Sequence, residues 1–176
     1  GASVNIVLIG LMGSGKSAVG RLLAERLDRP FIDTDALVEA EAGRAIAEIF
    51  AAEGEEGFRR REAAVIARVA AGDGQVIATG GGAVLRPANR DALRRNGLVI
   101  WLDAAPEALY RRVRAQGIGR RPLLAGPDPL GRLRALAAAR TPAYAAAAHV
   151  RLATDDRTLD DIVAEVADIL HERRRP

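Results

Sequence analysis

The sequence predicts an α/β fold, a three-layer sandwich in which a parallel β-sheet carries helices on both faces. Two observations lead to this prediction. Short apolar runs alternate with helical patterns along the chain. The first run leads through a glycine-rich turn into a helix, as a strand of such a sheet does at its carboxyl end. Because 176 residues is the usual size of one domain, we expect residues 1–176 to form a single domain.

The first half of the chain predicts three of five strands. The first is continuously apolar, as a buried strand is, and the helix after it ends before Pro30. Glycines mark the ends of the later helices. The predicted elements are strands at 4–9, 31–32 and 76–78 and helices at 16–27, 36–42, 45–52 and 55–71.

The second half predicts two more strands and four helices. Thr158, with Asp161 three residues on, caps the last helix. Thr141 and Pro142 are expected to interrupt an alanine-rich helix, because proline breaks helical hydrogen bonding. The elements are strands at 98–102 and 149–153, helices at 87–96, from 106, at 130–147 and from 159 to about 172, and a mobile loop at 116–127 that is rich in Gly, Pro and Arg.

Residues 10–17 read Gly-Leu-Met-Gly-Ser-Gly-Lys-Ser, between a predicted strand and a predicted helix. This pattern in this context is typical of a phosphate-binding P-loop, whose glycines let backbone N–H groups wrap around an anion at a helix N-terminus. Lys16 supplies charge for the outer phosphates and Ser17 a hydroxyl for Mg²⁺. The alternative is a plain glycine turn, but Lys16 is the only lysine of an arginine-rich chain.

Asp33 and Asp35 follow the second predicted strand. In extended backbone, residues two apart project to the same side. One carboxylate would then hold Mg²⁺ through water while the other accepts a proton from a hydroxyl nucleophile. The alternative is that Asp35 only caps the next helix.

Two arginines and a glycine run predict a pocket for a small anion. Arg59 and Glu62 lie one helical turn apart, so Glu62 can hold the guanidinium ready for a carboxylate. Arg140, beside the expected helix interruption, is a second candidate. The run at 80–82 leaves glycine N–H groups bare at a strand end. Each feature alone has a structural alternative, namely a solvated helix face or a plain turn.

Arg121 lies in the predicted loop 116–127. An arginine on a loop that closes over phosphates stabilises charge on the transferring group and excludes water. An exposed flexible loop is the alternative. His149 and His171 have no partner pattern, so neither is predicted to bind a metal.

Composition argues against several other classes. The net charge is only +3 despite a pI of about 10.1, and aromatic residues are 3% of the chain, so nucleic-acid binding is not expected. No apolar run approaches the length of a membrane span, and no signal peptide is visible. We therefore expect a cytoplasmic protein without membrane or nucleic-acid partners.

Several motifs, taken together and in this order, resemble those of the shikimate kinase family, a group of P-loop kinases. The resemblance runs from about Val4 to Leu170. It implies five parallel strands in the order 2-3-1-4-5, a mobile lid at about 116–127 and substrate-binding helices at about 34–62. The motifs are GLMGSGKS, FIDTD at 31–35, FRRRE at 58–62, TGGG at 79–82, RPLL at 121–124 and RTPAY at 140–144.

The resemblance implies ATP-dependent phosphorylation of the 3-hydroxyl of shikimate by a monomer, a step toward chorismate and the aromatic amino acids. Asp35 would be the base and would bind substrate hydroxyls, and Ser17 and Asp33 would serve Mg²⁺. Lys16 and Arg121 would hold phosphates and act in catalysis. The substrate would also contact Arg59, Glu62, Gly81, Gly82 and Arg140, and ATP would contact Gly13, Ser14, Gly15, Lys16, Ser17, Ala18, Arg114, Arg121 and Arg157.

Two alternatives remain open. A gluconate kinase or another small-metabolite kinase would share the P-loop, although Arg59, Arg140 and the RPLL lid favour a cyclic carboxylate. An inactive homologue would bind nucleotide without turnover. A regulatory GTPase is excluded, because its Asn-Lys-x-Asp motif needs a second lysine.

Overall fold

The structure is a computed structural model that describes residues 3–116, 124 and 126–173. Five parallel strands form one sheet in the order β2-β3-β1-β4-β5, which confirms the predicted order. The strands are β1 (Asn5–Ile9), β2 (Phe31–Asp33), β3 (Val76–Ala78), β4 (Gly97–Asp103) and β5 (Val150–Ala153). The helices are α1 (Lys16–Leu27), α2 (Thr34–Ala42), α3 (Ile46–Ala70), α4 (Pro87–Arg95), α5 (Pro106–Gln116), α6 (Pro129–Ala147) and α7 (Leu159–Arg173), with a short 3₁₀ helix, η1 (Ala83–Leu85).

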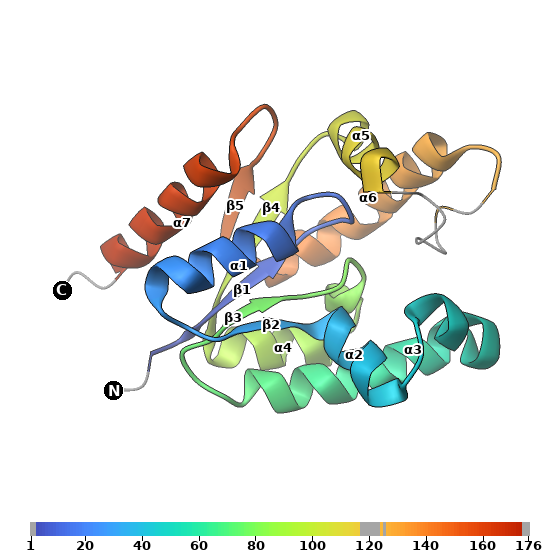
Figure 1. The fold of residues 1–176 in the computed structure, drawn as a ribbon, viewed down its shortest axis with the longest axis horizontal. Coiled ribbons are helices and arrows are strands. Elements are labelled where there is room, and N and C mark those ends of the chain that lie inside the picture. The colour runs from blue at the N-terminus through green and yellow to red at the C-terminus, as the bar shows by residue number, and fades with distance from the viewer. Residues whose placement is uncertain (1–2, 117–123, 125, 174–176) are drawn as a thin grey trace.

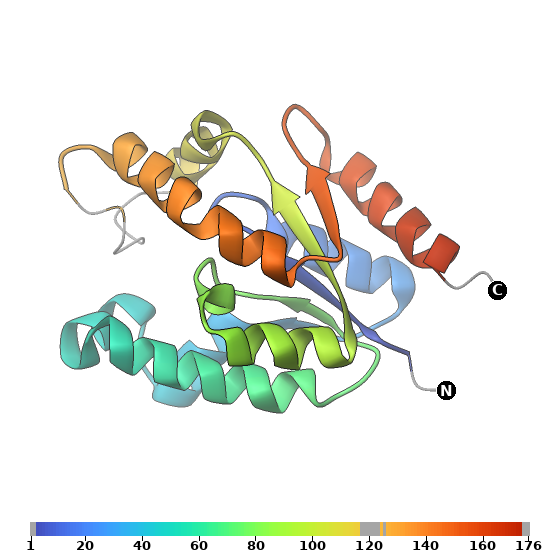
Figure 2. The ribbon, with the colours of Figure 1, turned by 180° about the vertical axis from the view of Figure 1, so that it is seen from behind.

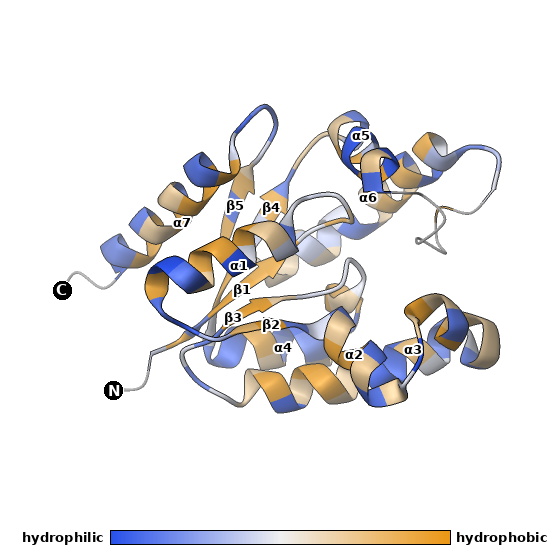
Figure 3. Cartoon of the chain, in the orientation of Figure 1, coloured by the Kyte–Doolittle hydropathy of each residue, from blue (hydrophilic) through white to orange (hydrophobic). Residues whose placement is uncertain are grey.

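Helices cover both faces of the sheet, as the three-layer prediction requires. Figures 1 and 2 show α1 and α7 on one face and α3, α4 and α6 on the other. Strand β1 explains this arrangement, because its successive side chains point to opposite faces. Ile6 and Leu8 pack in the core with α1 and α7, whereas Val7 and Ile9 pack in the core with α3, α4 and α6. The central strands are accordingly apolar on both faces (Figure 3).

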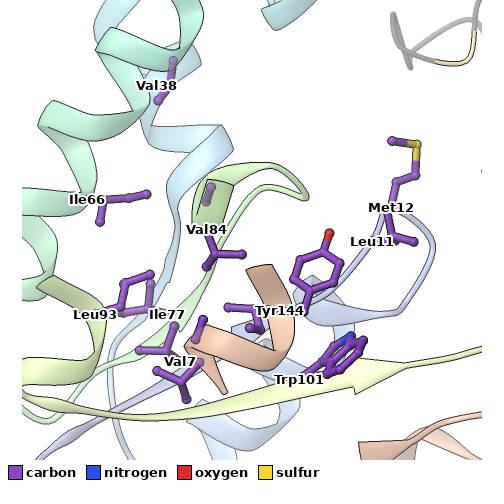
Figure 4. Close-up of a cluster of buried hydrophobic side chains, with 14 of the residues drawn as sticks. Val7, Leu11, Met12, Val38, Ile66, Ile77, Val84, Leu93, Trp101 and Tyr144 are labelled. Atoms are coloured by element: carbon purple, nitrogen blue, oxygen red, sulfur yellow. The ribbon is translucent and has the colours of Figure 1, made fainter. Parts of the chain in front are cut away.

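The second of these cores extends toward the carboxyl ends of the strands (Figure 4). There Trp101 of β4 lies 5.4 Å from Tyr144 of α6, measured between ring centroids, and both rings are buried. Leu11 and Met12, which follow β1, belong to the same cluster. The packing therefore connects the loop after β1 with helix α6.

Helix α3 has a kink at Gly54, where φ is 74° and ψ is 177°. The two helices predicted at 45–52 and 55–71 are thus the two halves of α3. Arg61 donates bidentate hydrogen bonds to Glu53 across this kink, the shortest at 2.9 Å. Inside the bend, the rings of Phe50 and Phe58 lie 5.1 Å apart. These contacts hold the two halves at a fixed angle.

Helix α6 runs without a break through Pro142, so the predicted interruption at Thr141-Pro142 is wrong. The Thr141 hydroxyl donates to the Ala137 carbonyl at 2.7 Å, so its hydrogen-bond partner lies one turn earlier in the same helix. Continuity places Arg140 and Tyr144 one turn apart on the buried face of α6. That burial offsets the cost of a proline inside a helix.

The carboxyl ends of the parallel strands meet at one edge of the sheet, where the loops after β1, β2 and β3 carry the residues that the sequence singles out. Within residues 3–116 and 126–173, no helix is long and apolar enough to cross a membrane.

Candidate active site

A cleft of about 870 Å³ opens at this edge, between the loop after β1 and helices α2 and α3. It brings together most of the residues that the sequence analysis proposed for nucleotide, substrate and metal. The predicted residues that line it are Gly13, Gly15, Lys16, Ser17, Ala18, Asp33, Asp35, Arg59, Glu62, Gly81, Gly82 and Arg140. Residues that lie far apart in sequence therefore share one site.

The loop over residues 10–15 has the backbone of a phosphate cradle. Gly13 and Gly15 have φ values of 81° and 91°, which side-chain-bearing residues rarely adopt. The Lys16 ammonium donates to the carbonyl oxygens of Gly10 at 2.7 Å and Leu11 at 2.9 Å. Ser14 does not line the cleft; it is buried, and its N–H donates to the Leu11 carbonyl at 3.1 Å. The cradle leads directly into the N-terminus of α1.

Ser17 and Asp33 meet beside this loop. The Ser17 hydroxyl donates to Asp33 Oδ2 at 2.9 Å, while Asp33 Oδ1 accepts the Ala36 N–H at 3.1 Å and caps α2. The helix starts at Thr34, so Asp33 and Asp35 do not share a stretch of extended backbone as predicted. The cap of α2 is Asp33 rather than Asp35. Both carboxylates line the cleft all the same.

The Ser17–Asp33 pair offers two oxygen ligands next to the phosphate cradle. Mg²⁺ in nucleotide sites usually takes one or two protein oxygens, with phosphates and water completing its octahedron. The described residues contain no cluster of three His, Cys, Asp or Glu side chains that would bind a metal without such help. The donor set therefore fits a magnesium ion that arrives with a nucleotide.

Arg59 and Glu62 form a buried ion pair on α3. Their side chains are 10% and 1% exposed, and Arg59 Nη1 donates to Glu62 Oε1 at 2.9 Å. Burial raises the pKa of the Glu62 carboxyl, against the opposing pull of the Arg59, Arg140 and Arg86 charges. Among the described residues, Glu62 Oε2 and Arg59 Nε have no hydrogen-bond partner, so the pair keeps polar atoms inside the cleft wall. Arg59 is also 3.4 Å from Glu55 Oε2.

Charged side chains lie directly against the glycine run after β3 and leave little room for a side chain there. A Cβ at Gly80 would stand 2.5 Å from Asp35 Oδ1, and one at Gly82 would stand 2.4 Å from Arg59 Nη2. A Cβ at Gly81 would meet Arg140 Nη1 at 3.1 Å. The backbone at 80–82 thus lies in direct contact with the charged groups of the site, and a side chain there would displace them.

Tyr144 supports the part of the cleft wall that Gly81 forms. Its hydroxyl donates to the Gly81 carbonyl, and the Arg140 guanidinium lies beside it. Burial raises the pKa of Tyr144 to about 12, so the phenol stays neutral and remains a donor at physiological pH. Arg140 itself is 4% exposed. Both residues come from α6: Arg140 lines the cleft, and Tyr144 lies one turn farther along because the helix continues through Pro142.

A second, smaller cavity of about 370 Å³ lies between α5 and the loop after β5. Arg157 lines it, together with Arg111 and Arg112. Arg114 is exposed and does not line it, and its contact with ATP stays a prediction. Arg121 lies outside the described residues, as does most of the proposed lid.

Sequence reasoning missed two kinds of site residue. Met12, Phe50 and Phe58 form apolar lining of the main cleft. In the sequence they resemble core residues, and nothing distinguishes them from the rest of the apolar pattern. Arg112 was one of three arginines on the predicted helix, and its contact with Gly13 joins residues 99 positions apart. No local signal marks that contact.

Comparison with known proteins agrees with the site. The family model described as shikimate kinase matches residues 12–171. A shikimate kinase of Symbiobacterium thermophilum is 76% identical over 170 residues, with 97% of this chain and 98% of that protein covered. A shikimate kinase of Burkholderia thailandensis is 48% identical, with 91% and 86% covered.

Solved structures give the same answer. A shikimate kinase from Acinetobacter baumannii, solved in complex with shikimate, matches with a TM-score of 0.94 and 36% identity over 99% of this chain and 96% of that one. A gluconokinase from Sinorhizobium meliloti, with 20% identity over 98% of each chain and a TM-score of 0.59, shares the fold alone. The chain belongs to the shikimate kinase family.

Proposed function

We propose that the chain transfers the γ-phosphoryl group of ATP to the 3-hydroxyl of shikimate, giving shikimate 3-phosphate. One observation carries the proposal: the phosphate cradle and the buried cations Arg59 and Arg140 line the same cleft, with Asp35 among them. A cleft with an anion cradle on one wall and two buried arginines on another suits two different anions. Family membership agrees with these being a nucleotide and a cyclic carboxylate.

On the nucleotide side, the backbone N–H groups around 13–18 and the N-terminus of α1 would bind the phosphates. Lys16 would leave the Gly10 and Leu11 carbonyls to reach the outer phosphates. Arg121 would join them there. Arg114 and Arg157 would flank the base, and Arg157 lines the second cavity.

On the acceptor side, Arg59 and Arg140 would bind the carboxylate, since a guanidinium matches a carboxylate through paired N–H groups and both arginines line the cleft. Glu62 would keep Arg59 in position through the 2.9 Å ion pair. The N–H groups of Gly81 and Gly82 would complete the pocket, because glycine has no side chain of its own to cover them. Together these groups would turn one face of a small polyol toward Asp35.

The reaction would depend on position and charge more than on covalent help from the protein. Asp35 would accept the proton of the 3-hydroxyl as its oxygen attacks phosphorus. Lys16 and Arg121 would stabilise charge on the transferring group. Ser17 and Asp33 would hold Mg²⁺, which supplies charge neutralisation at the phosphate oxygens when bound. The cleft walls formed by Phe50 and Phe58 would limit the access of water.

We also propose that residues 1–176 act as one domain and a monomer, with 34–62 as the substrate-binding helices and 116–127 as a mobile lid. A cytoplasmic location with no membrane or nucleic-acid partner fits the net charge of only +3.

A coupled ADP-release assay with Mg²⁺-ATP tests the function, with shikimate and gluconate offered separately and ³¹P NMR of the product. We expect turnover with shikimate and a new phosphomonoester signal, and no turnover with gluconate. Turnover with gluconate alone would make the chain another small-metabolite kinase. Nucleotide binding without turnover on either acid would make it an inactive homologue.

A further inference from the structure

Arg112 of α5 joins three segments of the chain. Its Nη1 donates to the Gly13 carbonyl of the phosphate loop at 3.1 Å, and its Nη2 donates to the Thr154 carbonyl after β5 at 3.1 Å. Nη1 also lies 3.5 Å from Thr154 Oγ1. A planar guanidinium can make such a bridge because its N–H groups point in several fixed directions.

The contact with Gly13 fixes one particular peptide unit. The Gly13 carbonyl and the Ser14 N–H belong to the same peptide, which is trans, so they point in opposite directions. The Ser14 N–H donates to the Leu11 carbonyl at 3.1 Å. Arg112 on one side and Leu11 on the other therefore hold this peptide from both ends. Its orientation sets the direction of the neighbouring N–H groups that face a phosphate.

Both anchors of Arg112 are themselves rigid. Gly13 rests on α5 so closely that a Cβ there would stand 2.8 Å from the Leu109 carbonyl and 2.9 Å from Val113 Cγ2. Thr154 is 0% exposed, and both its N–H and its hydroxyl donate to the Asp103 carbonyl, at 2.8 and 3.1 Å. Arg112 thus ties the phosphate loop both to α5 and to the segment after β5.

We propose that Arg112 is a positioning residue for the phosphate loop, which holds the Gly13–Ser14 peptide in the orientation that binds the triphosphate. The inference rests on the proposed function only in taking phosphate as the ligand of this loop. It is separate from any contact of Arg112 with a base in the second cavity. A residue that acts through the loop affects every ligand with a phosphate chain, whether or not a base is attached.

The test uses inorganic tripolyphosphate, which has no base, as the probe in isothermal titration calorimetry with Mg²⁺ present. Arg112→Lys keeps the positive charge, but a single ammonium cannot reproduce the planar bridge. We expect its affinity for tripolyphosphate to fall about tenfold, the size of one lost hydrogen bond to a charged group. Arg95→Lys is the matched control, since Arg95 is exposed on α4 and has no assigned role, and its affinity should stay within about twofold.

Three further measurements separate positioning from general damage. Shikimate binding and the melting temperature of Arg112→Lys should stay close to wild type. Amide hydrogen exchange over residues 13–17 should become faster in this variant, because the loop loses its outer anchor. Arg112→Gln serves as a second variant if Arg112→Lys does not fold.

Three results would overturn the proposal. Weaker ATP binding with unchanged tripolyphosphate binding would limit Arg112 to the base. Unchanged binding of both would leave it without a role. A parallel loss of shikimate affinity and melting temperature would make its role structural. Failure of the proposed function looks different: wild type would lack shikimate-dependent turnover while tripolyphosphate binding still depended on Arg112.

Discussion

The Ser17 hydroxyl donates a 2.9 Å hydrogen bond to Asp33 Oδ2, and this bond connects the first turn of α1 to the end of β2. Two separate signals of the sequence, the phosphate loop and the aspartate after the second strand, thereby become one site. The other oxygen of Asp33 caps α2, so one carboxylate both organises the fold and faces the cleft.

Asp33→Asn should separate these two tasks. Asparagine caps helices as well as aspartate, so the melting temperature should change little. The loss of charge should raise the Mg²⁺ concentration that gives half-maximal turnover, by about tenfold. Titration of activity with Mg²⁺ at saturating ATP measures this. Asp168→Asn, an exposed aspartate on α7, is the control. An unchanged Mg²⁺ requirement in Asp33→Asn would remove Asp33 from the metal site.

Arg59→Lys and Arg140→Lys should each raise the KM for shikimate by about tenfold or more, because a lysine cannot make the planar contact that an arginine makes with a carboxylate. The KM for ATP should change much less. Arg60→Lys is the matched control for the first variant, since the Arg60 side chain is 64% exposed on the same helix. An unaltered KM for shikimate in both variants would contradict the assignment of the carboxylate pocket.

Gly82→Ala should damage the acceptor site more than Gly81→Ala. The new Cβ would meet Arg59 Nη2 at 2.4 Å in the first variant, but Arg140 Nη1 only at 3.1 Å in the second. The larger overlap must move the Arg59 guanidinium and weaken its pair with Glu62. Steady-state kinetics with shikimate as the varied substrate should rank the KM values as Gly82→Ala above Gly81→Ala above wild type. The reverse order would contradict the close contact between the glycine run and Arg59.

His149 should make the stability of the fold depend on pH. Its Nδ1 accepts the Val99 N–H at 2.9 Å, and burial, aided by the Arg94 and Arg173 charges, lowers its pKa. The unfolded chain therefore binds a proton more readily. The contribution of neutral His149 to the free energy of unfolding is complete above its ordinary pKa of about 6.5. It is lost as pH falls through the lower pKa that His149 has in the folded chain.

Urea unfolding between about pH 8 and pH 5 measures this dependence. His149→Asn keeps an acceptor but does not titrate, so its loss of stability on acidification should be smaller than that of wild type. His171→Asn, which changes an exposed histidine of α7, should behave like wild type. Equal slopes for His149→Asn and wild type would disprove the effect.

The fold was largely predictable, because its signals are local. The apolar run before Gly10, the glycines after helices and the cap at Thr158 each act within a few residues, and the Asp161 N–H does donate to Thr158 Oγ1 at 3.1 Å. The continuity of helix α6 was not predicted, because tertiary packing outweighs the local tendency of Pro142 to break a helix. Burial of Tyr144 depends on contacts with Gly81, after β3, and with Trp101 of β4, which no short stretch of sequence contains.

The composition of the candidate site was predictable, but its geometry was not. The carboxylates, arginines and glycines that line the cleft stand out in the sequence because polar or bare residues follow apolar strands. The helical backbone at Thr34 did not stand out in the sequence, because the Asp33 cap starts the helix directly after the strand. The contacts of Arg112 could not be predicted for the same reason, because its partners are the carbonyls of Gly13 and Thr154 on distant segments.

The measurement that tests the account most directly is shikimate-dependent ADP release by wild type and Asp35→Asn, with Mg²⁺-ATP and both substrates saturating. Asp35 lines the cleft together with Lys16 of the phosphate loop and the arginines Arg59 and Arg140. We predict turnover in wild type and a fall in kcat of about a hundredfold or more in the variant, as expected for loss of a general base. Full turnover in Asp35→Asn would contradict the role of Asp35, and absence of turnover in wild type would contradict the proposed function itself.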